Sequence, residues 1–423
     1  MKSTGKKAGT LGIIVGGGPA PGINGVIAAA TIEAINQGKN VIGFYDGFKW
    51  LARGDTNHTV PLKIELVSRI HFEGGSILRT SRENPTKDPK KMANVLAGLK
   101  KLGVDWLVTI GGDDTAYSSS QVEKQAGGSI RVVHVPKTID NDLPLPGSMP
   151  TFGYETARTI GAEIVHNLME DARTTGQWFY VISMGRHAGH LALGIGKAAG
   201  ATTTIIPEEF HTPKVTLAEV CDVLEGSIIK RYAMGRPDGV AVIAEGVASK
   251  LTDADLKALE KQNLASLEYD DHDNPKLSEV DFGRAIKDEI KKRLARSKMK
   301  LKAVDKKIGY EVRCAAPVPF DCEYTRDLGY SAIRFLTNGG SGAMVSIQNG
   351  KMVPMYFPDI MDARGKTRVR MVDTATEYYA VARNYMIRLE KGDFADKRRL
   401  ALLAETGGYT PAEFVKKFSR YAK

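Results

Sequence analysis

Two adjacent carboxylates follow a double glycine at residues 111–115, Gly-Gly-Asp-Asp-Thr. The apolar run at residues 106–110 before them predicts a buried strand that ends in a tight loop. Glycines in such a loop let backbone N–H groups approach a phosphate closely. Asp113 can anchor Mg²⁺, because hard cations take carboxylate oxygens and bridge to phosphate. Asp114 repels the anion that the loop otherwise attracts, so we expect it to determine which phosphate donor is accepted.

A second motif, Pro-Lys-Thr-Ile-Asp-Asn-Asp at residues 136–142, follows the apolar run 132–135. It sets a lysine, a hydroxyl and two carboxylates within six residues. A carboxylate beside a cation can act as a base toward a hydroxyl, while the lysine neutralises phosphoryl charge. The alternative is an Asx-rich turn that merely ends a strand. The candidate side chains are Lys137, Thr138, Asp140 and Asp142.

A glycine loop at residues 16–24, Gly-Gly-Gly-Pro-Ala-Pro-Gly-Ile-Asn, follows the apolar run 11–15 and opens a predicted helix. Backbone N–H groups of such a loop and of a helix N-terminus form an anion site. The loop is not a Walker A motif, since no Gly-Lys-Ser/Thr follows, and it does not match Gly-x-Gly-x-x-Gly spacing. A tight turn is therefore the alternative interpretation of this segment.

Guanidinium groups recur in the remaining motifs. A second glycine loop spans residues 74–82, and the segment 183–190 ends another apolar run. Arginine suits bidentate recognition of phosphate, and glutamate can accept sugar hydroxyls. Each arginine alone could form a surface ion pair, whereas anion-binding groups at several strand ends favour a shared site. His187 and His190 have no evident third ligand, so we expect them to cap or pack rather than to bind a metal. The other candidates are Arg79, Arg82, Arg186, Glu245, Tyr310 and Arg313.

The elements that must position these motifs alternate along the chain. Apolar runs of strand type are separated by longer helical patterns such as residues 24–36. This alternation predicts parallel sheets covered on both faces, with ligands beyond the carboxyl ends of the strands. Residues 247–307 are predicted to be charge-rich and helical, with a loop at 268–274, and the last sixty residues are also predicted to be helical. The predicted strands are 11–15, 106–110, 132–135, 178–183 and 239–244.

Composition limits the class of protein. A chain of 423 residues exceeds a single typical core, so we expect two domains. Three cysteines without C-x-x-C spacing argue against disulfides or zinc and favour a reducing, cytoplasmic compartment; Cys314 and Cys322 are expected to be buried free thiols. No signal peptide or membrane span is recognised.

The net charge of +10 suits an anionic partner. Much of it is local, because residues 287–307 hold ten Lys or Arg against three Asp or Glu. A solvated basic helix face is the favoured interpretation of this segment, and a rim that collects anions is the alternative. Because the segment lacks interleaved aromatic residues, we expect no nucleic acid as partner.

Five motifs in this order resemble the phosphofructokinase family, over residues 10 to 362: they are 16–24, 74–82, 111–115, 136–142 and 184–186. The resemblance implies two similar Rossmann-like α/β/α domains with the active site in the cleft between them. It implies that residues 1–151 and 313–362 bind the phosphate donor, and that 152–312 and 363–423 bind the sugar phosphate. It also implies a homodimer or a homotetramer.

The same resemblance implies a role for each matched residue. Asp140 would take the proton from the 1-hydroxyl of fructose 6-phosphate, and Asp113 would hold Mg²⁺ on the donor phosphates. Gly18 would lie against those phosphates, and Arg82 would bridge donor and acceptor. The residues that would seat the sugar phosphate are Thr138, Asp140, Asp142, Met184, Gly185, Arg186, Glu245, Tyr310 and Arg313.

The sequence departs from the ATP-using bacterial members at two donor positions. Those proteins have glycine where this chain has Asp114 and Lys137, and the combination here resembles the pyrophosphate-dependent branch. Lysine at 137 discriminates poorly, since some ATP-dependent relatives carry it, so the assignment of the donor depends on Asp114. The implied reaction converts pyrophosphate and fructose 6-phosphate to fructose 1,6-bisphosphate and orthophosphate. The alternatives are an ATP-dependent kinase and a non-catalytic sugar-phosphate sensor.

Two further departures concern regulation and assembly. Allosteric bacterial members bind effector phosphates with arginines on the first helix, where this chain has Ala28 and Ile32. We therefore expect no allosteric regulation by nucleotides. Gln177 stands near the position of an intersubunit arginine, which leaves one contact to the sugar phosphate open.

Overall fold

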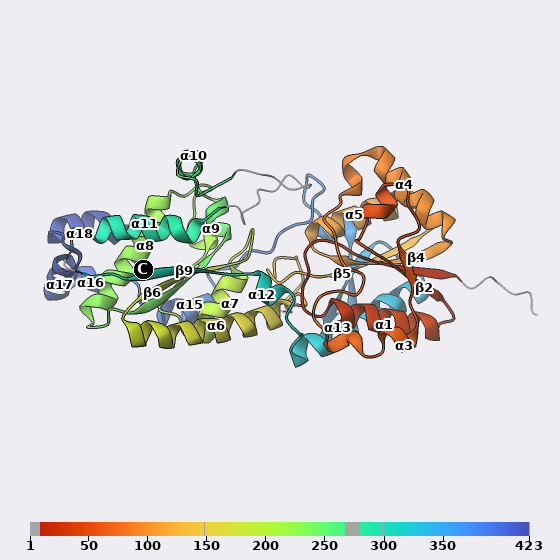
Figure 1. Ribbon diagram of the computed structural model, residues 1–423, viewed down its shortest axis with the longest axis horizontal. Coiled ribbons are helices and arrows are strands. Elements are labelled where there is room, and N and C mark those ends of the chain that lie inside the picture. The colour runs from red at the N-terminus through yellow and green to blue at the C-terminus, as the bar shows by residue number, and fades with distance from the viewer. Residues whose placement is uncertain (1–8, 148, 267–279, 298, 423) are drawn as a thin grey trace, which may run out of the picture. The chain divides into compact units, whose positions relative to one another are not determined.

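The computed structural model describes residues 9–147, 149–266, 280–297 and 299–422 (Figure 1). It divides the chain into two units. Unit 1 consists of the segment that ends at Ala157 together with Tyr310–Arg370, and unit 2 consists of Arg158–Gly309 together with the segment from Met371 onward. Sequence analysis predicted domain boundaries at residues 151, 313 and 362. In the structure, the boundaries between the two units lie at residues 157, 310 and 370.

Unit 1 is built on a seven-stranded sheet in the order β11-β10-β5-β4-β1-β2-β3. The central pairs β10–β5, β5–β4, β4–β1 and β1–β2 are parallel, and the edge pairs β2–β3 and β10–β11 are antiparallel. The strands are β1 (Thr10–Val15), β2 (Asn40–Phe44), β3 (Thr59–Pro61), β4 (Val104–Gly111), β5 (Arg131–Pro136), β10 (Ala343–Gln348) and β11 (Lys351–Tyr356).

Helices cover both faces of this sheet (Figure 1). Alternate residues of one strand point to opposite faces, so Ile13 packs in the core with α1 and α13, while Ile14 packs in the core with α2 and α4. The helical segments are α1 (Ile23–Asn36), α2 (Lys49–Ala52), α3 (Ile64–Val67), η1 (Ile70–Phe72), η2 (Pro85–Lys87), α4 (Pro89–Lys101), α5 (Asp113–Ala126), α12 (Tyr310–Arg313), α13 (Pro319–Thr337) and α14 (Phe357–Ile360).

Unit 2 contains a four-stranded sheet in the order β7-β8-β6-β9, in which every pair is parallel. Its strands are β6 (Trp178–Ser183), β7 (Thr203–Ile205), β8 (Gly239–Ala244) and β9 (Ala303–Ile308). Every residue of β6 and β8 is buried, as expected for a parallel sheet covered on both faces. The fold class and the five predicted strands are confirmed.

Helices α8 and α11 pack together on one face of the unit 2 sheet, and α6 and α7 lie on the other (Figure 1). The helical segments are α6 (Tyr154–Thr175), α7 (His190–Ala199), η3 (Pro207–Glu209), α8 (Leu217–Ala233), α9 (Gly246–Ser249), α10 (Asp253–Lys261), α11 (Phe282–Leu294), α15 (Glu377–Asn384), α16 (Lys391–Ala395), α17 (Lys397–Gly407), α18 (Pro411–Phe418) and η5 (Ser419–Tyr421).

Strand β9 corrects the prediction that residues 247–307 are helical. Ala303 pairs with Trp178 of β6, and the ladder continues to Ile308. Because β9 is an edge strand, its lysines stay partly or fully exposed, and Asp305 pairs with Lys287 of α11. Exposed charges at an edge strand hide the apolar pattern on which strand prediction depends. The loop predicted at 268–274 lies outside the described residues.

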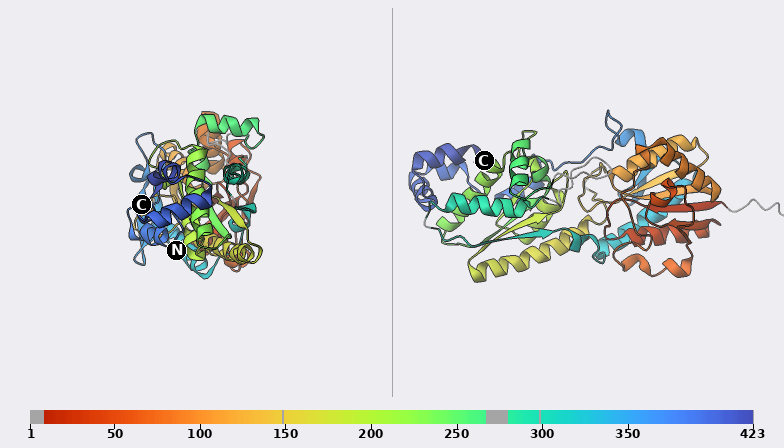
Figure 2. Two further views of the ribbon diagram at one scale, coloured as in Figure 1. Left: turned by 90° about the vertical axis from the view of Figure 1, so that its left-hand side faces the viewer. Right: turned by 45° about the horizontal axis from the view of Figure 1, so that its top comes forward.

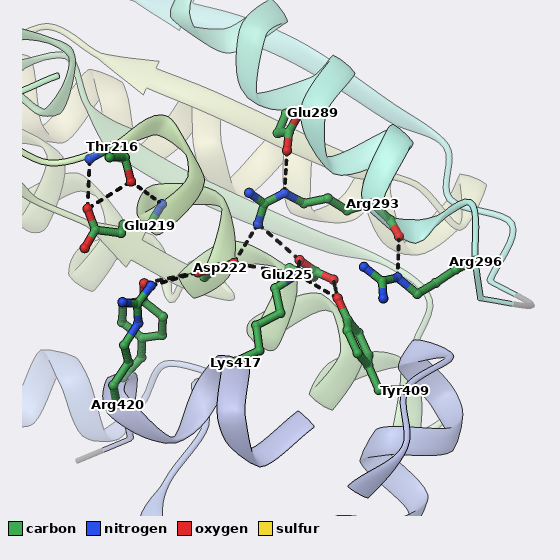
Figure 3. Close-up of polar contacts among 11 residues, drawn as sticks. Thr216, Glu219, Asp222, Glu225, Glu289, Arg293, Arg296, Tyr409, Lys417 and Arg420 are labelled. Atoms are coloured by element: carbon green, nitrogen blue, oxygen red, sulfur yellow. Dashed lines mark hydrogen bonds and ion pairs between the residues drawn. The ribbon is translucent and has the colours of Figure 1, made fainter. Parts of the chain in front are cut away.

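The C-terminal helices α16, α17 and α18 pack on the other helices of unit 2 (Figure 2). A cluster of charged groups holds them there (Figure 3). The fully buried Glu225 of α8 accepts hydrogen bonds from the Tyr409 hydroxyl and, at 2.7 Å, from Nζ of Lys417. Arg293 of α11 pairs with Asp222 at 2.7 Å, and Asp222 also accepts from Arg420 at 3.3 Å. These buried carboxylates and their cations come from three separate stretches of the chain, so they fasten the C-terminal segment to α8 and α11.

The cysteines differ from expectation. Cys221 is buried, Cys322 is half-buried and Cys314 is exposed, so the prediction of a buried thiol is wrong for Cys314. Cys314 follows directly after the short helix α12, and a turn there leaves its side chain in solvent. Within the described residues, no helix is long and apolar enough to cross a membrane.

Candidate active site

The carboxyl ends of β1, β4 and β5 bring three of the predicted motifs to one edge of the unit 1 sheet. These strands are parallel neighbours, and the segments 16–24, 111–115 and 136–142 come at their ends. The loop 74–82 joins them, since Gly17 N–H donates to the Ser81 carbonyl at 2.9 Å and the Thr80 hydroxyl donates to the Gly17 carbonyl at 2.6 Å. Segments more than sixty residues apart thus form one surface.

Lys137 lies beneath the glycine loop and is only 5% exposed. Its Nζ donates a hydrogen bond to the Gly18 carbonyl at 2.6 Å. Burial lowers the pKa of Lys137 to about 8, as does the neighbouring Arg313 cation, while the Asp140 and Asp113 carboxylates oppose this shift. The ammonium group therefore lies near the Arg313 guanidinium group and near the carboxylates of Asp140 and Asp113. At this place it can form an ion pair with an anionic ligand.

Arg313 lies against Gly18. Its Nε donates to the Pro19 carbonyl at 3.4 Å, and a Cβ atom added at Gly18 would lie 1.4 Å from its Nη2. Only glycine at position 18 leaves room for this guanidinium group. Burial lowers the pKa of Arg313, and the charge of Arg82 lowers it further. The Tyr310 ring lies 5.7 Å from the Arg313 guanidinium carbon, at the start of the same short helix.

The loop that carries Asp140 is shaped by hydrogen bonds to its own backbone. Thr138 Oγ1 accepts from the Asp140 N–H at 3.0 Å, and Asn141 adopts a left-handed φ of 57°. The Asn141 amide oxygen accepts from the Thr151 N–H at 3.0 Å. Arg370 donates to the Asn141 carbonyl at 3.1 Å and to the Met149 carbonyl at 3.1 Å. The loop thus has a defined conformation without support from a ligand.

Thr151 and Arg370 contact the loop that carries Asp140, and sequence analysis did not name either of them. Arg370 lies 229 residues from Asn141, and it donates to backbone carbonyls and to the Asn141 amide oxygen. Backbone carbonyls carry no signal in the sequence. Thr151 gives a weak signal at most, since its hydroxyl donates to the carbonyl of Thr138, thirteen residues away, at 2.8 Å. Both support the position of Asp140 rather than facing a ligand themselves.

The carboxylate of Asp142 is affected by its burial and by the nearby charges of Asp140 and Asp113. Burial raises the pKa of Asp142 well above its ordinary value, and the charges of Asp140 and Asp113 raise it further. Asp142 is 8% exposed, and its carbonyl accepts from the Arg370 N–H at 2.7 Å. A hydrogen bond from Thr138 lowers the pKa of Asp142 but does not outweigh burial. Asp142 therefore holds a proton more readily than an ordinary aspartate does.

Asp113 and Asp114 are the first two residues of α5, where sequence analysis predicted a loop. The positive end of the helix dipole offsets adjacent negative charges at this place. Thr115 explains two of the glycines, because a Cβ at Gly16 or Gly111 would lie 2.5 Å or 2.3 Å from its side chain. The Thr367 hydroxyl donates to the Asp113 carbonyl at 3.0 Å. The start of α5 is thereby fixed between β1 and β4.

The fit of this edge to a divalent cation follows from its donor set. Among the described residues, no three His, Cys, Asp or Glu side chains are arranged to hold a metal ion. Mg²⁺ is commonly bound by one or two carboxylates together with substrate phosphates rather than by a full protein cage. The Asp113 carboxylate beside the phosphate-type loops fits that mode of binding.

The other predicted residues lie in unit 2, at the ends of the neighbouring strands β6 and β8. Met184, Gly185 and Arg186 follow β6, and the Glu245 N–H donates to the Ser183 carbonyl at 2.8 Å. Gly185 has a φ of 143°, and Gly246 approaches its carbonyl so closely that an added Cβ would lie 3.0 Å away. Strand pairing thus brings these four candidates to one sheet edge, whereas Gly18, Arg82, Tyr310, Arg313 and the residues of segments 111–115 and 136–142 belong to unit 1.

One residue that sequence reasoning missed holds the β6 loop. Glu208 accepts from the Gly189 N–H at 2.9 Å and from the Val372 N–H at 2.9 Å with the same carboxylate oxygen. Burial raises the pKa of Glu208. The loop after β6 is therefore joined to the C-terminal segment of unit 2. An acidic residue after a short strand gives no sequence signal for such a role.

A cavity of about 600 Å³ lies in unit 1, between α1 and α13. Ala28 and Ile32 line it, as do Glu33, Glu323 and Asp327, with Arg326 among them. Carboxylates outnumber guanidinium groups in this lining, which disfavours an anionic ligand.

Comparisons with known proteins decide the family. A family model described as phosphofructokinase matches residues 10–336. The chain belongs to the phosphofructokinase family. It is 53% identical to a pyrophosphate–fructose 6-phosphate 1-phosphotransferase of Naegleria fowleri, over 98% of this chain and 96% of the relative. It is 55% identical to the protein of that name in Thermotoga maritima, over 96% of this chain and 97% of the relative.

Solved structures agree with the fold. The pyrophosphate-dependent phosphofructokinase of Marinobacter aquaeolei aligns with a TM-score of 0.65 at 15% identity, covering 88% of this chain and 91% of that one. At this identity the likeness concerns the fold alone. The family recognised from five motifs is thus confirmed by the family model and by relatives that match nearly the whole chain.

Proposed function

We propose that this chain transfers a phosphoryl group from pyrophosphate to the 1-hydroxyl of fructose 6-phosphate, giving fructose 1,6-bisphosphate and orthophosphate. The observation that carries the proposal is the identity of 53% and 55%, over nearly the whole chain, to two relatives named for this reaction. The reaction is expected to be reversible, because no nucleoside triphosphate has to be remade. Magnesium, a cytoplasmic location and a homodimeric or homotetrameric assembly are part of the same proposal.

Unit 1 supplies the groups for phosphoryl transfer in this scheme. Asp140 takes the proton from the attacking hydroxyl, and its loop is held by Thr138, Asn141 and Arg370. Lys137 and Arg82 neutralise the charge that develops on the phosphoryl oxygens, which is the main catalytic contribution in such reactions. Asp113 would hold Mg²⁺, and the ion would neutralise charge on the donor phosphates.

Two sets of residues, each within one unit, are assigned to the sugar phosphate. Thr138, Asp142, Tyr310 and Arg313 come from unit 1, and Met184, Gly185, Arg186 and Glu245 come from unit 2. A guanidinium group binds a phosphate through two parallel hydrogen bonds, and a carboxylate such as that of Glu245 accepts from sugar hydroxyls. The donor is bound by unit 1 alone in this proposal.

Donor choice is assigned to Asp114. It stands on the first turn of α5, one residue from the proposed metal ligand, and adds a carboxylate where the α-phosphate of ATP passes in the ATP-using members. Pyrophosphate has no such group. Loss of nucleotide regulation follows from Ala28 and Ile32 in a cavity that carries three carboxylates. ADP or phosphoenolpyruvate added to the assay should therefore leave the rate unchanged.

A coupled assay of fructose 1,6-bisphosphate formation with Mg²⁺, supplied with pyrophosphate or ATP in parallel, tests the proposal. Activity with pyrophosphate and little with ATP is the expected result. Preference for ATP would overturn the assignment of the donor while leaving the sugar site intact. A lack of activity with both donors would favour the alternative of a non-catalytic sugar-phosphate sensor. Equilibrium binding of fructose 6-phosphate would then test that alternative.

A further inference from the structure

A histidine with no assigned role lies between the two donor-side motifs. His134 of β5 is fully buried. Its Nε2 lies 3.0 Å from the Gly111 carbonyl oxygen, at the end of β4. The same oxygen accepts the Lys137 N–H at 2.7 Å. One carbonyl at the start of the carboxylate motif is therefore bonded to both the lysine backbone and the imidazole.

The hydrogen-bond partners fix the tautomer of His134. A carbonyl oxygen can only accept, so the proton must be on Nε2. Nδ1 then accepts from the Thr109 hydroxyl at 2.9 Å. Burial lowers the pKa of His134 to about 3, so the ring is neutral. A neutral ring with both nitrogens bonded has one orientation only.

The network continues into α5. Because Thr109 gives its proton to His134, its oxygen can only accept from Ser119, which lies 2.7 Å away. The Ser119 hydroxyl is also 2.6 Å from the Thr115 carbonyl, so it shares its one proton between these two acceptors. Thr115 is the residue whose side chain fills the space beside Gly16 and Gly111. A continuous set of buried contacts therefore joins the end of β4, the end of β5 and the first turn of α5. Lys137, directly after β5, and Asp113 and Asp114, at the start of α5, are assigned above to the phosphate donor.

We propose that His134 is a positioning residue for the phosphate donor: by fixing the Gly111 carbonyl, it sets the distance between the start of α5 and Lys137. This inference rests on the proposed function for the chemical identity of the donor. An apolar side chain at position 134 would fill the core equally well, but it would leave the Gly111 carbonyl with one hydrogen bond in place of two. Buried polar side chains with every group satisfied give a site one defined arrangement.

Two replacements distinguish positioning from mere filling of the core. In His134→Gln, the amide nitrogen reaches about the place of Nε2 and can still donate to Gly111. In His134→Asn, the shorter side chain ends near the place of Nδ1 and cannot reach Gly111. We expect the asparagine variant to raise KM for pyrophosphate about tenfold, from the loss of one buried hydrogen bond. KM for fructose 6-phosphate should stay within about twofold, and the glutamine variant should recover most of the loss.

His166→Asn, at an exposed position of α6, serves as the matched control and should leave both KM values unchanged. Equal behaviour of the glutamine and asparagine variants would overturn the proposal, as would an equal rise in both KM values. If the wild-type protein prefers ATP, the proposed function fails, but the selective effect on KM of the donor still tests the role of His134.

A measurement on the intact wild-type protein covers the case in which a variant does not fold. Nitrogen-15 NMR of labelled histidine should show the Nε2–H tautomer for His134, and its resonance should shift when pyrophosphate is added but not when fructose 6-phosphate is added. A Thr109→Val variant should weaken this response, because it removes the donor to Nδ1. A His134 resonance that pyrophosphate leaves unmoved would overturn the proposal.

Discussion

Replacement of Gly18 by alanine is expected to abolish most activity while leaving the fold intact. The added Cβ would lie 1.4 Å from Nη2 of Arg313 and 2.6 Å from its Cζ, so the guanidinium group must leave its place. Unlike its neighbour Gly17, Gly18 does not have a positive φ, so alanine fits the backbone. The clash falls on the end of a flexible side chain, which can swing into solvent.

The expected changes in stability and in rate follow from displacement of the Arg313 guanidinium group. The displaced guanidinium group makes one weak hydrogen bond in this structure, to the Pro19 carbonyl at 3.4 Å. Replacing glycine by alanine at a compatible position stabilises a protein by about 0.4–1 kcal/mol, so the net change in unfolding free energy should be close to zero. Loss of one hydrogen bond from Arg313 to the charged sugar phosphate costs about 1.5–3 kcal/mol, or about 10–10² in kcat/KM.

A double-mutant cycle with Arg313→Met tests this reasoning. Steady-state rates with pyrophosphate and fructose 6-phosphate are measured for Gly18→Ala, Arg313→Met and the double variant, with thermal unfolding as the control for folding. If the methyl group acts through Arg313, the double variant should be about as slow as Arg313→Met alone. If the rate losses of the two single variants multiply in the double variant, the methyl group does not act through Arg313 and the reasoning is refuted. A Gly18→Ala protein with wild-type activity would refute it as well.

Three further predictions follow from named contacts. Asp114→Gly should raise the rate with ATP, because it removes a carboxylate from the first turn of α5, and an unchanged ratio of ATP to pyrophosphate rates would contradict this account. The kcat/KM for pyrophosphate should fall as pH rises through about 8, because the pKa of Lys137 is lowered to that value and only the protonated form is cationic. Lys137→Arg should remove this fall, and a fall of the same midpoint in that variant would assign it to another group. Tyr409→Phe should lower the free energy of unfolding by about 1–3 kcal/mol, since it removes a hydrogen bond to the buried Glu225 carboxylate. A thermal unfolding curve unchanged from wild type would contradict this account, and Tyr385→Phe, at a position that is 82% exposed, serves as the control.

The sequence by itself determined the strands that carry the chemistry and the order of the motifs behind them. Uninterrupted apolar runs such as residues 178–183 can only be buried strands or helices, and their glycine-rich ends mark where the chain turns. Because parallel strands end at one sheet edge, Asp113, Lys137 and Gly18 were expected together, and the structure brings them together in unit 1. The local pattern is enough here, since each element buries its own apolar residues.

Tertiary structure decided the contacts that orient these groups. Arg313 reaches Pro19 across 294 residues, and Arg370 reaches Asn141 across 229. Arg313 was named as a candidate but not its contact with Pro19, and Arg370 lies outside every motif. Most of their acceptors are backbone carbonyls, which every residue has. The edge strand β9 and the tautomer of His134 could not be predicted from the sequence either. Strand β9 depends on pairing with β6, and the tautomer depends on the Gly111 carbonyl, which the sheet brings near. Periodicity reports which side of an element is buried, whereas hydrogen bonds between distant segments depend on how those elements pack.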